Sequence, residues 1–168
     1  MFVIIPARSG SKGLKNKNTL DFFGKPLIAH TIEVAKQSNY IKEIIVSTDC
    51  EEIYNIGIQY GADNSFLRPI DLAQDSSLAI DTYKYTINRL EEENNITIND
   101  FIVLLPTSPL RTVEDVNHAI ELFYSKNADS VISYCEESHP IKWHQYINSD
   151  LSFEPIFEEK LENRQEYK

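Results

Sequence analysis

Short apolar runs and amphipathic segments follow one another along most of the chain. The apolar runs are rich in β-branched residues, which is typical of strands buried on both faces of a parallel sheet. We expect such strands at Phe2–Ala7, Glu43–Thr48, Asp100–Leu105 and Ser130–Tyr134, with a shorter one at Ser65–Leu67.

The segments between these runs carry apolar residues at helical spacing. Gly61 suits the C′ position that ends one helix, and Thr112 with Asp115 forms an acidic variant of the capping box at the start of another. The expected helices begin at Pro26, cover Glu51–Tyr60 and Ser76–Glu93, and run from Thr112 to about Lys126.

Alternating strands and helices predict βαβ crossovers, and therefore an α/β fold in which helices cover a mostly parallel sheet. This pattern stops at Glu136, after which no helical period is visible. Beyond that point two short antiparallel strands are expected, at Tyr146–Asn148 and Phe153–Phe157. We therefore predict a domain over residues 1–135 and an arm over residues 136–168.

The composition is that of a globular protein with an acidic balance. Of 168 residues, 42% are hydrophobic and 25% are charged, which is enough for a core. The net charge of −10 argues against general binding to nucleic acid or membrane surfaces, because both are polyanions. No leader peptide and no membrane-spanning run are visible. Cys50 and Cys135 are expected to be reduced thiols in a cytoplasmic protein, with a disulfide as the alternative.

One loop reverses the acidic balance of the chain. Between the first strand and the first helix, the segment Arg8–Asn18 (the basic loop) contains glycine, serine, four cationic side chains and no acid. Such a loop exposes backbone N–H groups to a phosphate, and arginine and lysine add charge. Its spacing is neither that of a Walker A loop nor that of the dinucleotide fingerprint. The alternative is a solvated basic loop.

Polar residues also follow the other expected strands. Asp49 comes after the second strand, Arg68 after the short strand, and the segment Leu104–Arg111 after the next. In open parallel sheets, ligands bind beyond the carboxyl ends of the strands. We therefore expect these residues and the basic loop to share one edge of the sheet.

Several segments, in order and at similar spacings, resemble the cytidylyltransferases that activate sialic acid and related bacterial nine-carbon sugar acids. The segment that opens the chain, "IIPARSGSKGLKNKN", resembles the N-terminal signature of that family. The others are "IIVSTD" at Ile44–Asp49, "FLRPIDLAQDSS" at Phe66–Ser77, "LLPTSPLRT" at Leu104–Thr112, "ESHPIK" at Glu137–Lys142 and "RQ" at Arg164-Gln165.

The resemblance implies a Rossmann-like three-layer α/β/α nucleotidyltransferase domain with a C-terminal dimerisation arm. It also implies transfer of CMP from CTP to a 2-keto sugar acid with release of pyrophosphate, assisted by Mg²⁺, in a cytoplasmic homodimer that binds neither nucleic acid nor membrane. Arg8 and Lys17 would act in catalysis. The implied nucleotide contacts are Ala7, Arg8, Ser9, Gly10, Lys12, Lys17, Asn18 and Arg68, and the implied sugar contacts are Ser108, Arg111, Lys142 and Arg164. Lys15 is not expected to contribute.

Several of these residues also have simpler interpretations. Asp49 could approach a metal or the sugar, or it could cap the helix that begins at Glu51. Ser108 and Arg111 could line the sugar pocket or only form a stiff turn. His139 and His144 lack a third ligand at a suitable spacing, which argues against a metal site.

The chain departs from the family pattern in two ways. Leu105 stands where many sialic-acid enzymes have a glutamine that touches the sugar, which favours a different nine-carbon acid such as legionaminic or pseudaminic acid. Family members also continue for about one more α/β unit that carries the metal-binding aspartates, so we expect a truncated chain whose metal ligands are unknown. The alternatives are a cytidylyltransferase for another keto sugar acid and a non-catalytic nucleotide-binding dimer.

Overall fold

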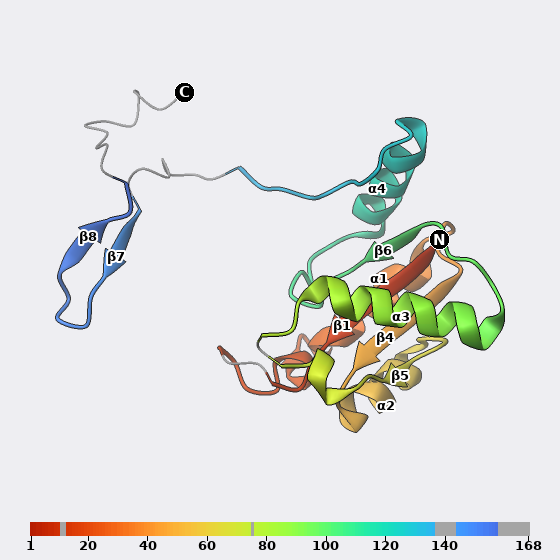
Figure 1. The fold of residues 1–168 in the computed structure, drawn as a ribbon, viewed down its shortest axis with the longest axis horizontal. Coiled ribbons are helices and arrows are strands. Elements are labelled where there is room, and N and C mark those ends of the chain that lie inside the picture. The colour runs from red at the N-terminus through yellow and green to blue at the C-terminus, as the bar shows by residue number, and fades with distance from the viewer. Residues whose placement is uncertain (11–12, 75, 137–143, 158–168) are drawn as a thin grey trace. The chain divides into compact units, whose positions relative to one another are not determined.

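A computed structural model describes residues 1–10, 13–74, 76–136 and 144–157 of the chain. The residues fall into two compact units, Met1–Asp129 and Ser130–Lys168, and each is described by itself. The first unit contains a parallel sheet with the strand order β5-β4-β1-β6 (Figure 1). Its strands are β1 (Phe2–Ala7), β4 (Glu43–Thr48), β5 (Phe66–Leu67) and β6 (Phe101–Val103).

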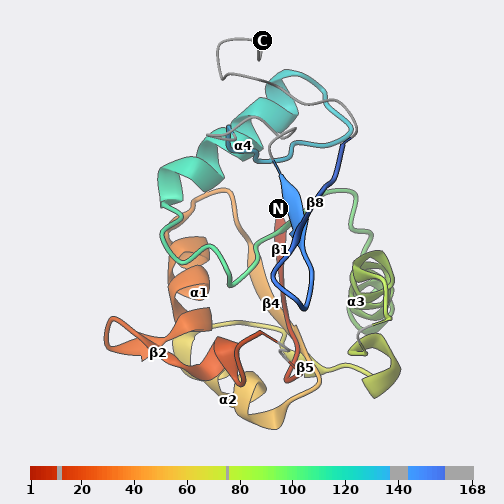
Figure 2. The ribbon, with the colours of Figure 1, turned by 90° about the vertical axis from the view of Figure 1, so that its left-hand side faces the viewer.

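Helices cover both faces of this sheet and give three layers. On one face, alternate residues of β1 and β4 pack against α1 (Leu27–Gln37), α2 (Glu51–Tyr60) and α4 (Val113–Ser125). On the other face, Ile45 and Phe66 pack with Leu90 of α3 (Ala79–Asn94). Figure 2 shows α1 and α3 on opposite sides of the strands. The predicted three-layer α/β/α arrangement is therefore confirmed.

Most of the predicted elements form within a few residues of their expected bounds. β1, β4 and α2 match the expected ranges, and Gly61 ends α2 in the left-handed region at φ 97°. α3 begins at Ala79 rather than at Ser76, and β6 is shorter than the expected strand Asp100–Leu105. Two 3₁₀ turns, η1 (Lys17–Thr19) and η2 (Ile70–Leu72), lie in the connecting loops.

A small hairpin between η1 and α1 was not predicted. It pairs β2 (Asp21–Phe22) with β3 (Lys25–Pro26) in antiparallel register. Both residues of its turn have positive φ, 51° at Phe23 and 84° at Gly24, as the type I′ turn of a two-residue hairpin requires. Asparagine or aspartate usually occupies the first of these positions, and a bulky phenylalanine there is uncommon. The sequence signal for this hairpin is therefore weak.

In the second unit, β7 (Gln145–Ile147) and β8 (Phe153–Pro155) form the expected antiparallel pair. All residues of both strands are exposed. The predicted strand Ser130–Tyr134 is wrong, because residues 130–136 are described and form no strand. Ile132 and Tyr134 are 65% and 87% exposed. An apolar run becomes a strand only where a neighbouring strand satisfies its backbone groups.

No helix within the described part of the chain is long and apolar enough to span a bilayer.

The predicted capping box at the start of α4 is confirmed and can be tested by stability. The Asp115 N–H donates to Thr112 Oγ1 at 3.2 Å, and the Thr112 N–H donates to the Asp115 carboxylate at 2.9 Å. We expect Thr112→Ala to lower the free energy of unfolding by about 1 kcal/mol in urea titrations at pH 7. The exposed loop residue Thr97 supplies a control, Thr97→Ala, which should change it by less than about 0.5 kcal/mol.

The pH dependence gives the same test a second arm. The backbone N–H of Thr112, and then its hydroxyl, hold the pKa of Asp115 below its ordinary value. A carboxyl with a lowered pKa in the folded state stabilises the fold above its unfolded pKa, and this contribution is lost as the pH falls through the folded pKa. Thr112→Ala keeps the backbone N–H and removes only the hydroxyl, so the variant loses the hydroxyl's share of this contribution. That share of its deficit should therefore shrink in acid, and a deficit that grew in acid would contradict this assignment.

Candidate functional site

The ends of three strands bring the basic loop together with two other charged residues. Ala7 pairs with Thr48 across β1 and β4, and Thr48 pairs with Leu67 across β4 and β5. Because the strands are parallel and these residues lie in one row, the residues that follow them leave the sheet at the same edge. Those residues are Arg8, Asp49 and Arg68. The expected shared edge is thus present.

Asp49 links the basic loop to the end of β4. Its Oδ1 accepts a hydrogen bond from the Ser9 N–H at 2.9 Å, and its Oδ2 accepts one from the Ser9 hydroxyl at 2.5 Å. It does not cap α2, whose N-cap residue is Cys50, and among the described residues no side chain caps that helix. Of the two interpretations offered by the sequence, the helix cap is therefore wrong. One sequence signal could have indicated this contact. Asp49 is an acid directly after β4, the strand that pairs with β1, and the loop that follows β1 contains no acid.

Arg68 is a buried cation at this edge. Only 7% of the residue is exposed, and its guanidinium donates to the Ser47 carbonyl at 3.1 Å. Its Nε is also buried and has no hydrogen-bond partner among the described residues. Burial lowers the pKa of this guanidinium, Asp49 opposes that shift, and Arg8 adds to it. A buried cation with an unpaired donor favours an anion beside it.

The buried side chain of Asn18 holds the start of the basic loop in place. Its side chain is buried in η1, and its amide donates to the Arg8 carbonyl at 3.2 Å. The Arg8 guanidinium donates to the Ala73 carbonyl at 3.4 Å. In this conformation Asn18 therefore acts on the path of the loop backbone, a role that residue type alone did not indicate.

The remaining described residues of the loop differ in exposure. Ala7 is buried at the end of β1, and Lys17 is half-buried. Ser9, Gly10 and Lys15 are exposed, and a Cβ built on Gly10 would meet nothing within 4 Å. The loop surface at Gly10 is thus open to a ligand, and the exposed Lys15 offers a natural comparison for Lys17.

The segment after β6 forms a turn held by Arg111. Its guanidinium donates to the Leu105 carbonyl at 3.3 Å, and its backbone N–H donates to the Ser108 carbonyl at 3.2 Å. One guanidinium nitrogen, Nη1, is buried without a partner among the described residues. Burial lowers the pKa of Arg111, and Asp115 opposes the shift. Arg111 therefore stabilises this turn, while Ser108 and Leu105 are exposed.

Three of the predicted site residues, Lys12, Lys142 and Arg164, lie outside the described residues, as does His139. In the ranges 1–10, 13–74, 76–136 and 144–157, no group of three or more His, Cys, Asp or Glu side chains is placed to hold a metal ion.

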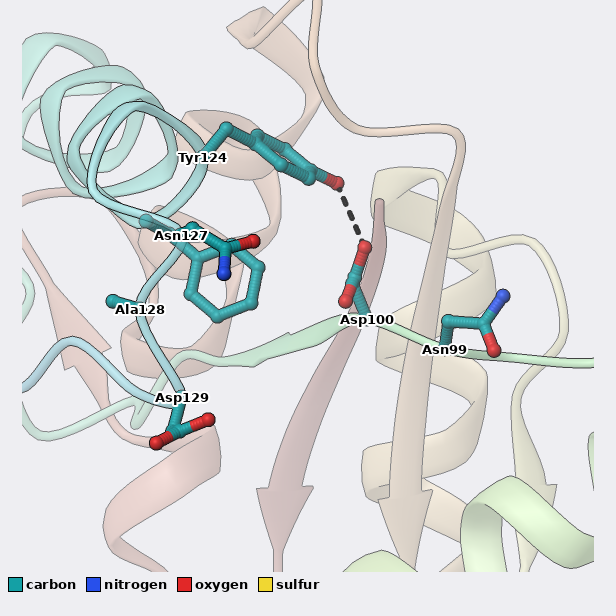
Figure 3. A pocket seen from close by; sticks show the side chains of 7 residues that line it. Asn99, Asp100, Tyr124, Asn127, Ala128 and Asp129 are labelled. Carbon is teal, nitrogen blue, oxygen red and sulfur yellow. Dashed lines mark hydrogen bonds between the residues drawn. The ribbon is translucent and has the colours of Figure 1, made fainter.

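A separate hollow of about 370 Å³ lies beside the amino end of β6 (Figure 3). Tyr124 at the end of α4 donates to the Asp100 carboxylate at 3.2 Å across it. Its lining contains no cation and consists of Asn99, Asp100, Phe123, Tyr124, Asn127, Ala128 and Asp129. Since β6 and β1 are parallel, this hollow and the basic loop lie at opposite ends of the sheet. Its acidic lining does not suit a phosphate.

Comparison with known proteins identifies the class of protein that this fold and site define. The family model described as Cytidylyltransferase matches residues 2–148. The chain belongs to the cytidylyltransferase family.

Relatives with particular names narrow the class further. The chain is 40% identical over 149 residues to the CMP-N,N'-diacetyllegionaminic acid synthase of Legionella pneumophila, a match that covers 89% of this chain and 63% of that protein. It is 38% identical to the N-acylneuraminate cytidylyltransferase of Escherichia coli, over 83% of this chain and 32% of the relative. It is 35% identical to the pseudaminic acid cytidylyltransferase of Campylobacter jejuni, over 88% and 63% respectively. The chain thus spans less than two thirds of each of these relatives.

A solved structure shows the same fold with a nucleotide. The structure of a CMP:2-keto-3-deoxy-manno-octonic acid synthetase complexed with CTP matches this chain with a TM-score of 0.60 and 25% identity. The match covers 75% of this chain and 48% of that one.

Proposed function

We propose that the protein containing this chain transfers CMP from CTP to a nine-carbon 2-keto sugar acid and releases pyrophosphate. The observation that carries the proposal is the buried Arg68, with an unpaired Nε, which follows Leu67 at the sheet edge from which the basic loop departs. The names of the relatives, which act on legionaminic, neuraminic and pseudaminic acids, support the sugar class.

In this reaction the anomeric hydroxyl of the sugar acid attacks the α-phosphorus of CTP. A bond forms from phosphorus to the sugar oxygen, the bond to pyrophosphate breaks, and the hydroxyl proton is released. Such chemistry depends on positioning and charge neutralisation. We assign these two roles to Arg8 and Lys17, with Lys12, Asn18 and Arg68 binding the nucleotide.

Main-chain groups of Ala7, Ser9 and Gly10 are proposed to bind the cytosine. Because the N–H of Ser9 is already donated to Asp49, its carbonyl is the main-chain group that remains for a base donor. The sugar carboxylate would meet Ser108, Arg111, Lys142 and Arg164, since cationic side chains bind carboxylates well.

Magnesium is proposed as the cofactor on the family resemblance alone. The metal would share the charge of the triphosphate. Its ligands are not assigned, because the described residues hold no suitable cluster. A cytoplasmic location is proposed because Cys50 and Cys135 are free thiols.

The nucleotide assignment is tested by titrating CTP, ATP and GTP into the chain by calorimetry. We expect a preference for CTP, and we expect Lys17→Ala to weaken CTP binding about tenfold, because a half-buried cation would lose a charge-assisted contact with phosphate. Lys15→Ala is the matched control, since Lys15 is an exposed lysine of the same loop, and should change the affinity less than twofold. Equal affinities for the three nucleotides would contradict the cytidine assignment, and equal effects of the two variants would contradict the site.

We propose that the protein is a homodimer formed through the arm over residues 136–168. The support is that β7 and β8 expose Tyr146, Ile147 and Phe153, each by more than half. Exposed apolar patches usually mark contact surfaces.

Light scattering at micromolar concentration should report twice the chain mass of 19.4 kDa. Phe153→Asp should shift the protein towards monomer, because a carboxylate would be desolvated at the contact. The control is Ile58→Asp on α2, an exposed apolar residue outside the arm. A wild-type monomer would overturn the dimer proposal.

For the sugar, we propose a nine-carbon acid other than sialic acid, such as legionaminic or pseudaminic acid. Leu105 is 46% exposed at the carboxyl end of β6, where a hydrocarbon side chain cannot replace an amide. Legionaminic and pseudaminic acids carry a methyl group at C9, where sialic acid has a hydroxymethyl group. An apolar wall discriminates by only ~1–3 kcal/mol per methylene-sized difference.

The test supplies each acid in turn to the protein as its gene encodes it, with CTP and Mg²⁺, and follows pyrophosphate release. We expect kcat/KM to be higher for legionaminic or pseudaminic acid than for sialic acid, and Leu105→Gln to narrow the difference. The highest efficiency with sialic acid, unchanged by Leu105→Gln, would show the interpretation of Leu105 to be wrong. Activity with an eight-carbon keto sugar acid alone would instead favour the alternative function, a cytidylyltransferase for another keto sugar acid.

A further inference from the structure

The contact between Asp49 and Ser9 joins two strand ends through both oxygens of one carboxylate. Ser9 lies just beyond β1 and Asp49 just beyond β4, and both donors of Ser9 are used. We propose that Asp49 is a positioning residue that acts through Ser9 to fix the first residues of the basic loop for CTP. The ligand in this proposal rests on the proposed function, whereas the positioning itself does not.

The contact acts at the residue where placement matters most. The peptide group between Arg8 and Ser9 is held on both sides, because the Asn18 amide donates to the Arg8 carbonyl at 3.2 Å and Asp49 accepts the Ser9 N–H at 2.9 Å. Two anchors on either side of one peptide group set the direction in which the Arg8 side chain leaves the backbone. A displacement of about 1 Å at a catalytic group is enough to slow a reaction strongly.

The contact also explains why an acid is tolerated beside a phosphate site. Asp49 lies near the buried cation Arg68, because it opposes the lowering of the Arg68 pKa by burial. An unpaired carboxylate at this edge would repel a triphosphate. Both carboxylate oxygens of Asp49 accept hydrogen bonds from Ser9, so neutral donors of the loop already stabilise its negative charge.

The first arm of the test measures positioning without a nucleotide. Hydrogen exchange of the Ser9 amide is followed by NMR in the wild type, in Asp49→Ala and in Asp49→Asn. We expect exchange about tenfold faster in Asp49→Ala, because loss of a charge-assisted hydrogen bond frees the amide. Asp49→Asn should rescue most of the protection, because its Oδ1 can still accept the N–H. The control is Asp63→Ala, since Asp63 accepts the Ile44 N–H at the other end of β4 and should leave Ser9 unchanged.

The second arm measures coupling to the ligand. CTP affinity is determined for Asp49→Ala, Ser9→Ala and the double variant, with and without Mg²⁺. Asp49→Ala should weaken binding about tenfold, and in the Ser9→Ala background its effect should fall to about threefold, because part of the path from Asp49 to the loop is already lost. The Asp49 effect should be the same with and without Mg²⁺.

The outcomes separate this proposal from the proposed function. Additive effects of the two variants, an effect that appears only with Mg²⁺, or unchanged Ser9 exchange in Asp49→Ala would overturn the positioning role. If the wild type does not prefer CTP, the proposed function fails and the exchange arm alone decides the positioning role. Should Asp49→Ala fail to fold, Asp49→Asn and Ser9→Ala, compared by circular dichroism and the same two readouts, decide it instead.

Discussion

The in-register parallel pairing of β1 with β4, and of β4 with β5, is the constraint on which the site depends. A parallel ladder places strand ends side by side, and here it aligns Ala7, Thr48 and Leu67. A shift of one residue in either pairing would turn side chains to the opposite face and would separate Arg68 from the basic loop. The apolar faces of β1 and β4 hold this register, since Val3, Ile5 and Val46 are fully buried against the helices on one side. The core therefore determines the geometry of a site made of charged residues.

The electrostatics of the site follow from its position in an acidic chain. With a net charge of −10, the protein repels anions at long range. The proposed nucleotide binding would therefore rely on local cations held at fixed positions, and the hydrogen bonds of Asp49 and Asn18 to the basic loop are suited to that purpose. Both anchors come from within the same compact unit, so the first part of the loop is placed before any ligand arrives. Such preorganisation reduces the entropy lost on binding.

The sequence was sufficient to predict the layers of the fold, because buried parallel strands and amphipathic helices have distinct periods. It also placed Arg8, Asp49 and Arg68 at one edge, since the order of strands and loops implies that edge. It failed at Ser130–Tyr134, where apolar residues indicated a strand, because strand formation depends on a neighbour that composition does not reveal. It also missed the Ser9–Asp49 contact, because a hydrogen bond between residues 40 positions apart depends on tertiary geometry. The roles of Lys12, Lys142 and Arg164 remain predictions.

Arg68 shows how the fold and the proposed function constrain each other. Burying a guanidinium with an unpaired Nε is unfavourable for the ligand-free protein, and the nearby Arg8 adds repulsion. Asp49 offsets part of this, but both of its oxygens are shared with Ser9. A phosphate bound at this edge would supply the missing charge. Binding would then relieve the unfavourable free energy of burying this cation, and the relief would add to the affinity. The same buried cation lowers the stability of the ligand-free fold.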